Sequence, residues 1–180
     1  NIYMKVFYLF LLSLFFITCK DKKQSTVPAA GELSSPEQFF SFTKVDSANP
    51  VLSADSSQFV CPILNKNVYW AEKDVFNPAA VVRNDTLFLL YRAEDKIGKY
   101  AGTSRIGLAW SLDGLHFTKH PSPVFYPDND AQKILEWEGG CEDPRIVQDE
   151  KGTYFMTYTA YDGDKARLMV GSSPDLSHWN

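Results

Sequence analysis

The sequence repeats itself with a period of a little over 60 residues, and this repeat limits what the chain can fold into. Residues 78–93 and 144–160 share one order, which is a proline with a short apolar run, a polar turn, and a longer run rich in aromatic residues. Residues 108–117 and 169–179 match in the same way. The shift is 66 residues between the prolines that open the first pair and 62 between the aspartates of the second pair. The chain therefore contains two copies of one structural unit.

Each unit has the pattern of several short β-strands. Runs of β-branched and aromatic residues alternate with turns, and no 3.6-residue period is sustained. Repeats of this kind are typical of β-propellers, whereas a β-sandwich, which also has strands at this spacing, is the alternative that the internal repeat makes less favourable. A propeller closes into a ring of ~4 to 8 blades, so two units would form only part of one. We predict an all-β chain that covers roughly the first two blades of a β-propeller.

Residues 1–19 have the pattern of a signal peptide. Lys5 precedes an apolar run of 13 residues at 6–18, shorter than the ~20 that a membrane-spanning helix requires. Cys19 follows at once, so the segment resembles a bacterial lipoprotein signal in which the cysteine is lipidated; a cleaved signal in which Cys19 is incidental is the alternative. Residues 20–36 are predicted to be a polar tether and residues 37–180 the folded region. We expect export to the bacterial cell envelope and a lipid anchor at the periplasmic or outer-membrane surface.

Composition excludes several classes of function. A hydrophobic content of 44% and an aromatic content of 14% suffice for a packed core. The net charge of −4 is spread without long runs of one sign, which argues against a nucleic acid partner. The three histidines are scattered and no paired cysteine motif exists, so no metal site is predicted. Cys61 and Cys141 could pair in an exported protein, but we expect Cys141 to be a small buried residue.

Residues 137–145 read Trp-Glu-Gly-Gly-Cys-Glu-Asp-Pro-Arg and concentrate the groups that carbohydrate cleavage needs. A glycosidic bond breaks when an acid protonates the leaving oxygen while a nucleophile reaches the anomeric carbon. Three carboxyl groups, an arginine and an aromatic ring lie within these nine positions. Acidic residues beside Gly and Pro are also common in ordinary turns, so the spacing by itself leaves both interpretations open.

Three further stretches join this motif in a recognisable order. They are Phe-Asn-Pro-Ala-Ala at 76–80, Tyr-Arg-Ala-Glu-Asp at 91–95 and Ser-Arg-Ile-Gly at 104–107. With residues 139–145 they resemble glycoside hydrolase family 130, over a region from about Val60 to the end of the chain. The resemblance implies a five-bladed β-propeller that acts on β-mannosides, as a phosphorylase or as a mannosidase. The chain is then expected to be an N-terminal fragment of a lipoprotein member of that family.

The resemblance also implies roles for single residues. Asp143 matches the general acid, which requires a raised pKa, and Glu138 and Glu142 lie close enough in sequence to contribute to it. Asn77 and Asp143 directly precede the two matched prolines, so we expect both side chains to lie at the mouth of the propeller channel. The positions that match sugar-binding residues are Asn77, Arg92, Asp95, Arg105, Glu142 and Arg145.

The aromatic residues near the motif are more ambiguous. Trp137 could stack on a sugar, but aromatic residues beside turns usually cover a core. Tyr91 and Tyr158 are expected in the core, and Tyr161 remains a possible sugar platform.

Hydrolysis and phosphorolysis, both with inversion, differ in what attacks the sugar. A hydrolase needs a second carboxylate as base, for which Glu138 and Glu142 are candidates, whereas a phosphorylase needs cations for phosphate, for which Arg167 is one. No cofactor is expected, apart from inorganic phosphate as a co-substrate of a phosphorylase. Export favours hydrolysis of β-mannoside oligosaccharides, because a sugar phosphate formed outside the cell would be lost to metabolism. The remaining alternatives are a phosphorylase and a non-catalytic glycan-binding propeller.

Overall fold

The computed structural model describes residues 42–100 and 102–180. The predicted signal peptide, Cys19 and the tether at 20–36 lie outside the described residues. Val45–Asn180 form one compact unit, which contains every strand discussed below. In the described part of the chain, no helix is long and apolar enough to cross a membrane.

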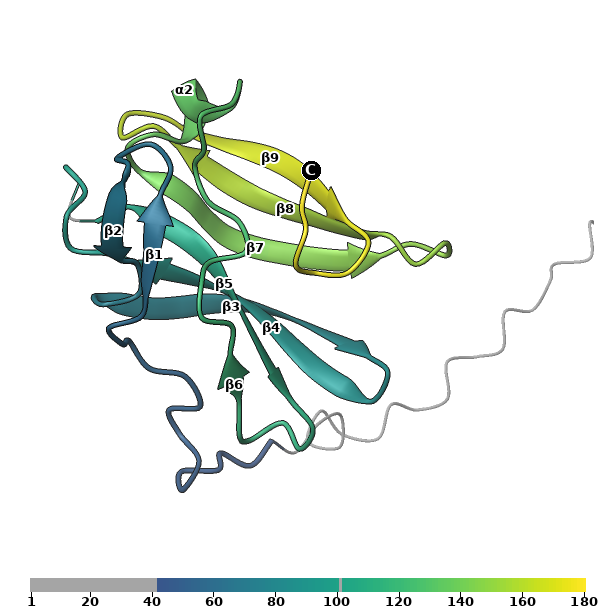
Figure 1. Ribbon diagram of the computed structural model, residues 1–180. Helices are drawn as coiled ribbons and strands as arrows, with labels where there is room; N and C mark the ends of the chain where they lie inside the picture. Colours follow the sequence, from purple (N-terminus) through teal and green to yellow (C-terminus); the bar gives the residue numbers. More distant parts are fainter. Residues whose placement is uncertain (1–41, 101) are drawn as a thin grey trace, which may run out of the picture. The chain divides into compact units, whose positions relative to one another are not determined.

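The unit is built almost entirely of antiparallel β-strands (Figure 1). β1 (Gln58–Cys61) and β2 (Lys66–Tyr69) pair as a small separate hairpin. The order β3-β4-β5-β7-β8-β9 forms a larger sheet, to which β6 adds by pairing with β5. Its members are β3 (Asp74–Arg83), β4 (Thr86–Glu94), β5 (Ser104–Ser111), β6 (Thr118–Lys119), β7 (Gly140–Gln148), β8 (Tyr154–Tyr161) and β9 (Ala166–Ser173), with the short helix α2 (Lys133–Glu136) before β7. The prediction of an all-β chain is confirmed.

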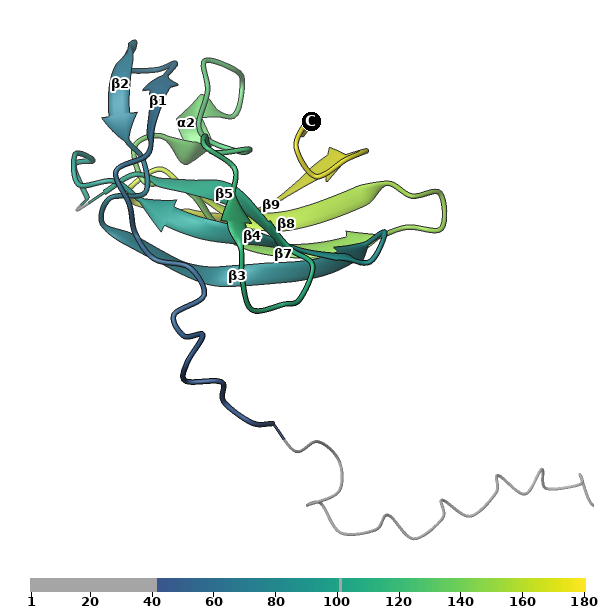
Figure 2. The same cartoon turned by 60° about the horizontal axis from the view of Figure 1, so that its bottom comes forward.

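The larger sheet consists of two meanders, the first from β3 to β6 and the second from β7 to β9. Within each meander consecutive strands pair antiparallel, but a single parallel pair, Ser104 with Gly140, joins the first meander to the second. The opening strands β3 and β7 also contact each other (Figure 2). The two meanders coincide with the two units of the sequence repeat, and the number of blades in the complete ring stays a prediction.

The turn chemistry of the sequence explains where strands end. Asn84 and Asp85 have φ values of 49° and 57° and form the two-residue loop between β3 and β4. The sequence predicted a polar turn at this place. Asn and Asp tolerate this left-handed backbone, and such loops match the twist of a hairpin.

A second turn occurs once in each unit and follows β5 and β9. Its aspartate accepts hydrogen bonds from backbone N–H groups of the turn and lies 2.7 or 2.8 Å from the Nδ1 atom of a histidine three residues later. The equivalent residues are Asp113 with His116 and Asp175 with His178.

The main core lies between the meanders. Ile106 and Leu108 of β5 are buried with Met156 and Tyr158 of β8, and burial of each such side chain stabilises the fold by about 1.5 to 3 kcal/mol. A second cluster packs the β1–β2 hairpin against β4, through Phe59, Trp70, Tyr91 and neighbours. Tyr91 and Tyr158 are thus core residues, as expected.

The two cysteines of the folded region are free and buried. Burial, and after it the nearby carboxyl group of Glu136, raises the pKa of the Cys141 thiol well above its ordinary value. This environment agrees with the expected packing role of Cys141.

The junction at Gly140 predicts which glycine the fold depends on. Gly140 has a φ of 116°, and a Cβ there would overlap the backbone O and N of Ser104. We expect Gly140→Ala in the full-length protein to lose about 3 kcal/mol of unfolding free energy or more, or to be insoluble. Gly114→Ala is the matched control, because Gly114 also has a positive φ, 76°, but the Cβ would meet only Leu87 at 3.8 Å. Urea unfolding measures both, and equal losses would contradict the prediction.

Candidate functional site

Both opening strands carry a β-bulge at the predicted motifs. The pairing register shifts between Phe76 and Ala79 in β3, and between Glu142 and Arg145 in β7. Asn77 and Asp143 lie in these bulges, each in the left-handed region with φ of 48° and 50°. The proline that follows each of them has no N–H, so the bulge costs no ladder hydrogen bond at that position.

The bulges bring Asn77 and Asp143 into contact. Asn77 donates from Nδ2 to Oδ1 of Asp143 at 2.8 Å, across 66 positions of sequence. The two side chains thus lie together, whereas their position at the mouth of a propeller channel stays a prediction.

Arg92 on β4 is the centre of the site. Its NH2 group donates to Glu94 Oε1 at 2.6 Å and to Glu142 Oε1 at 2.8 Å, and its NH1 group donates to Asp143 Oδ1 at 3.2 Å. Its Nε donates to the Ser104 hydroxyl at 3.0 Å. A planar guanidinium suits this task, because its five donors point in fixed directions toward several oxygen acceptors.

Arg92 and the polar side chains linked to it form what we call the Arg92 cluster. The sequence did not indicate three of its members, Glu94, Lys73 and Ser104. Glu94 binds Arg92 and also accepts from the Nζ of Lys73 at 2.7 Å. Ser104 lies opposite Glu94 in the β4–β5 ladder, and its hydroxyl is 3.3 Å from both Glu94 and Glu142. Strand alternation could have found Glu94, because residues two apart on a strand share a face and Arg92 was already singled out.

The carboxyl groups of the cluster have different surroundings. Burial is the main cause that raises the pKa of Glu142, and the negative charges of Asp143 and Glu94 raise it further. The charge of Arg92 and the hydrogen bond from Ser104 lower it, but they do not outweigh burial, so the pKa is raised. Burial also raises the pKa of Glu94, but hydrogen bonds and charge from Lys73 and Arg92 outweigh it and hold that pKa below its ordinary value. The cluster thus contains one carboxyl group with a raised pKa beside one with a lowered pKa.

Asp143 is the most accessible carboxyl of the cluster. Its side chain is 37% exposed, against 14% for Glu142 and 11% for Glu94. Both of its hydrogen bonds, from Asn77 and Arg92, fall on Oδ1. Among the described residues Oδ2 has no hydrogen-bond partner, so a proton on Asp143 would reside on Oδ2, where a substrate oxygen can reach it.

Asp95 and Arg105 lie away from this cluster. The Arg105 NH1 group donates to Asp95 Oδ2 at 2.7 Å, and both side chains are only 1% exposed. Asp95 Oδ1 accepts the backbone N–H groups of Ile97, Gly98 and Thr103 and so fixes the β4–β5 loop. The structure gives these two residues the position of a buried structural pair, where the resemblance implied contact with sugar.

Arg167, the phosphate candidate, occupies the equivalent position in the second meander. It donates to Asp162 Oδ2 at 2.7 Å in a more exposed pair. An Asp–Arg pair therefore closes the β4–β5 hairpin of the first meander and the equivalent β8–β9 hairpin of the second.

The other motif residues also point elsewhere. Arg145 is exposed and its NH1 group donates to the adjacent Pro144 carbonyl at 2.7 Å. Glu138 accepts the Lys99 backbone N–H at 3.2 Å in the β4–β5 loop. Trp137 packs against the hydrophobic cluster that joins the β1–β2 hairpin to β4. It thus covers a core, as aromatic residues beside turns usually do. In the described residues no group of three or more His, Cys, Asp or Glu side chains is arranged to hold a metal.

The chain is similar to known carbohydrate-active proteins. The model of glycoside hydrolase family 130, described as beta-1,4-mannooligosaccharide phosphorylase, matches residues 43–180. A 1,2-beta-oligomannan phosphorylase from Thermoanaerobacter sp. (strain X514) is 38% identical over 118 residues, which are 61% of this chain and 37% of that protein.

Solved structures are similar as well. A glycosyl hydrolase from Bacteroides ovatus is 45% identical with a TM-score of 0.77, over 82% of this chain and 42% of that one. The same coverage and TM-score, with 46% identity, hold for a structure from work on glycoside hydrolases of this family that target beta-1,2 mannosidic linkages in Candida mannan. The chain thus spans about two fifths of the length of these relatives.

The raised pKa of Glu142 predicts a pH dependence of stability. The native state holds the Glu142 proton more tightly than the unfolded state, so its contribution to stability falls as pH rises from the ordinary value of 4.5 through the raised pKa. Glu142→Gln removes this titration, so its stability relative to wild type should increase with pH over that window. Thermal unfolding of the full-length protein measures the difference, with Glu150→Gln, at an exposed carboxyl, as control. A difference that stays constant with pH would refute the assignment.

Proposed function

The chain belongs to glycoside hydrolase family 130, and from this premise we propose that the full-length protein cleaves β-mannosidic bonds with inversion. In this proposal the two meanders are the first two blades of a five-bladed propeller. The Arg92 cluster then lies at one end of the two opening strands, where the channel of the ring begins. The substrate is a β-mannoside oligosaccharide or glycan.

One observation carries the proposal. Asp143 is held by Asn77 and Arg92 through Oδ1, while Oδ2 is left for substrate. This arrangement suits a general acid, since the side chain is fixed and its proton faces outward. Glu142 is a second candidate, because burial raises its pKa and its carboxyl group binds the same guanidinium. The variants proposed below separate the two.

We favour hydrolysis of β-1,2 linkages over phosphorolysis. The structural relative described for hydrolases of beta-1,2 mannosidic linkages is 46% identical to this chain. The proposed export supports the same choice, because a sugar phosphate formed outside the cell would not be recovered. Phosphorolysis is the second candidate, supported by the 38% identical phosphorylase from Thermoanaerobacter, whose name also specifies a β-1,2 linkage.

Substitution of Asp143 tests for an acid. We expect Asp143→Asn in the full-length protein to lower kcat about 10²- to 10⁴-fold, because the proton source is lost while the volume stays nearly the same. Asp85→Asn is a matched control, since Asp85 also adopts a left-handed φ, 57°, in a hairpin loop of the first meander. Full activity of Asp143→Asn combined with loss of activity in Glu142→Gln would move the acid to Glu142. Full activity of both variants would show that neither Asp143 nor Glu142 is the acid. If the wild-type protein itself shows no turnover, a non-catalytic glycan-binding propeller is favoured.

The attacking group is tested by incubating the full-length protein with β-1,2-mannobiose, with and without inorganic phosphate. We expect mannose in both samples at equal rates, because water is the proposed nucleophile. Chromatography of the products measures this outcome. Mannose 1-phosphate formed only in the presence of phosphate would replace the hydrolase by the phosphorylase.

We also propose that the protein is exported and anchored through lipid on Cys19. Cys19→Ser should move the protein from the membrane fraction to the soluble fraction and abolish labelling with palmitate. Ser25→Ala in the predicted tether is the control and should stay membrane-bound and labelled. An unchanged membrane fraction in Cys19→Ser would show that Cys19 is incidental.

A further inference from the structure

Two tyrosines beside the Arg92 cluster pack on the backbone of glycines. The ring of Tyr161 lies on Gly139, where an added Cβ would overlap the ring. Its hydroxyl donates to the Gly163 carbonyl at 3.0 Å. The ring of Tyr100 lies in turn on Gly163, which has a φ of 98° and, like Gly139, leaves no space for a Cβ. Both rings therefore pack against main chain where a side chain would not fit.

The two rings form an aromatic corner, defined here as Tyr100 and Tyr161. Their centroids are 6.2 Å apart and their planes meet at 55°. Tyr100 is 42% exposed, so a face of the corner is open to solvent. The Lys99 ammonium lies over the Tyr100 ring, 5.1 Å from its centroid, on an exposed and flexible side chain.

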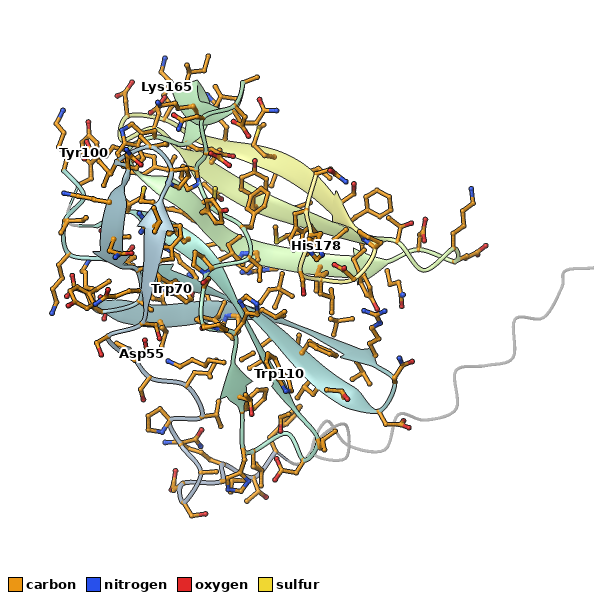
Figure 3. The ribbon with its side chains drawn as sticks, in the orientation of Figure 1. Asp55, Trp70, Tyr100, Trp110, Lys165 and His178 are labelled. Atoms are coloured by element: carbon orange, nitrogen blue, oxygen red, sulfur yellow. The ribbon has the colours of Figure 1, made fainter. Side chains whose placement is uncertain are left out.

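The aromatic corner lies next to the Arg92 cluster. Tyr161 pairs with Gly140 in the β7–β8 ladder, and the next pair on the same face is Thr159 with Glu142, about 7 Å along the strand. Ser104, which contacts Arg92 and Glu142, donates its backbone N–H to the carbonyl of Gly139 at 2.8 Å, and Gly139 is the residue on which the Tyr161 ring packs. Figure 3 shows Tyr100 at the same end of the sheet, where β4 ends and β5 begins.

A single exposed aromatic residue would need no explanation, because folded proteins expose many apolar side chains. Here two loops from different meanders and two glycines build one surface. An aromatic face is a surface that binds the C–H face of a pyranose ring, and a nearby ammonium such as that of Lys99 can donate to the sugar hydroxyls.

We propose that Tyr100 and Tyr161 form a subsite that stacks a further sugar unit of the mannoside chain, beside the units joined by the bond that is cleaved. This proposal rests on the proposed function, since it assigns that function a preference for chain length. Longer chains gain binding energy at the aromatic corner, whereas a disaccharide ends before reaching it.

The experiment compares kcat/KM for β-1,2-mannobiose and β-1,2-mannotetraose in the full-length protein. In the wild type we expect the tetraose to have the higher kcat/KM. Tyr100→Ala should remove roughly tenfold from kcat/KM for the tetraose, mainly through KM, and thereby abolish the preference for chain length. Tyr100→Phe keeps the ring and should retain the preference.

Phe155→Ala is the matched control. Phe155 is also a partly exposed aromatic residue, 38%, but it lies near the opposite end of β8 from Tyr161, about 20 Å away along the strand. It should leave the chain-length preference unchanged. The same preference in Tyr100→Ala as in the wild type would overturn the proposal, and so would equal loss in Phe155→Ala.

Calorimetric titration with β-1,2-mannotetraose separates this proposal from the proposed function, because it does not require turnover. If the wild type binds the tetraose without cleaving it, the cleavage proposal fails. The subsite then stands if Tyr100→Ala weakens the affinity roughly tenfold while Tyr100→Phe does not. No measurable binding by the wild type would overturn the subsite.

Discussion

The site depends on one guanidinium group. Arg92 is mostly buried and donates to three carboxylates and a hydroxyl. Without its positive charge, the three carboxylates would repel one another at short distance. Because Arg92 and Glu94 belong to the first meander and Glu142 and Asp143 to the second, the same contacts also fix the second meander relative to the first. Removal of one partner from a buried ionic network leaves the others uncompensated, so the cluster forms as a whole or not at all.

The two units share the same backbone conformation at equivalent positions but carry different side chains there. Asn77 and Asp143 have the same left-handed conformation before a proline in the same bulge, and the amide of one orients the carboxylate of the other. The Asp–Arg pair that closes the β4–β5 hairpin recurs at the β8–β9 hairpin; it is fully buried as Asp95 with Arg105 and more exposed as Asp162 with Arg167. Both bulges border the carboxylate cluster, but one carries an amide and the other a carboxylate, which is how two equivalent units produce one asymmetric site.

The candidate site could be predicted in part. The ordered motifs placed Asn77, Arg92, Glu142 and Asp143 together, and the structure joins them within hydrogen-bonding distance. Asp95 and Arg105 stand in the same motifs but point into the interior, because a strand sends successive side chains to opposite faces and a motif written as letters does not show which face is which. Lys73 lies outside every motif, and it enters the cluster only because the β3–β4 ladder brings its ammonium to Glu94.

The sequence by itself determined the all-β class, the two units, the turns that end their strands and the residues that meet at the bulges. These properties are local or are repeated, so strand periodicity, turn chemistry and the 66-residue shift are sufficient to specify them. Only the tertiary structure decided which charged residues bind Arg92, which are buried in structural pairs, and which carboxyl has its pKa raised. The physical reason is that burial and the distances between charges depend on residues far apart in the chain, and a sequence pattern records neither.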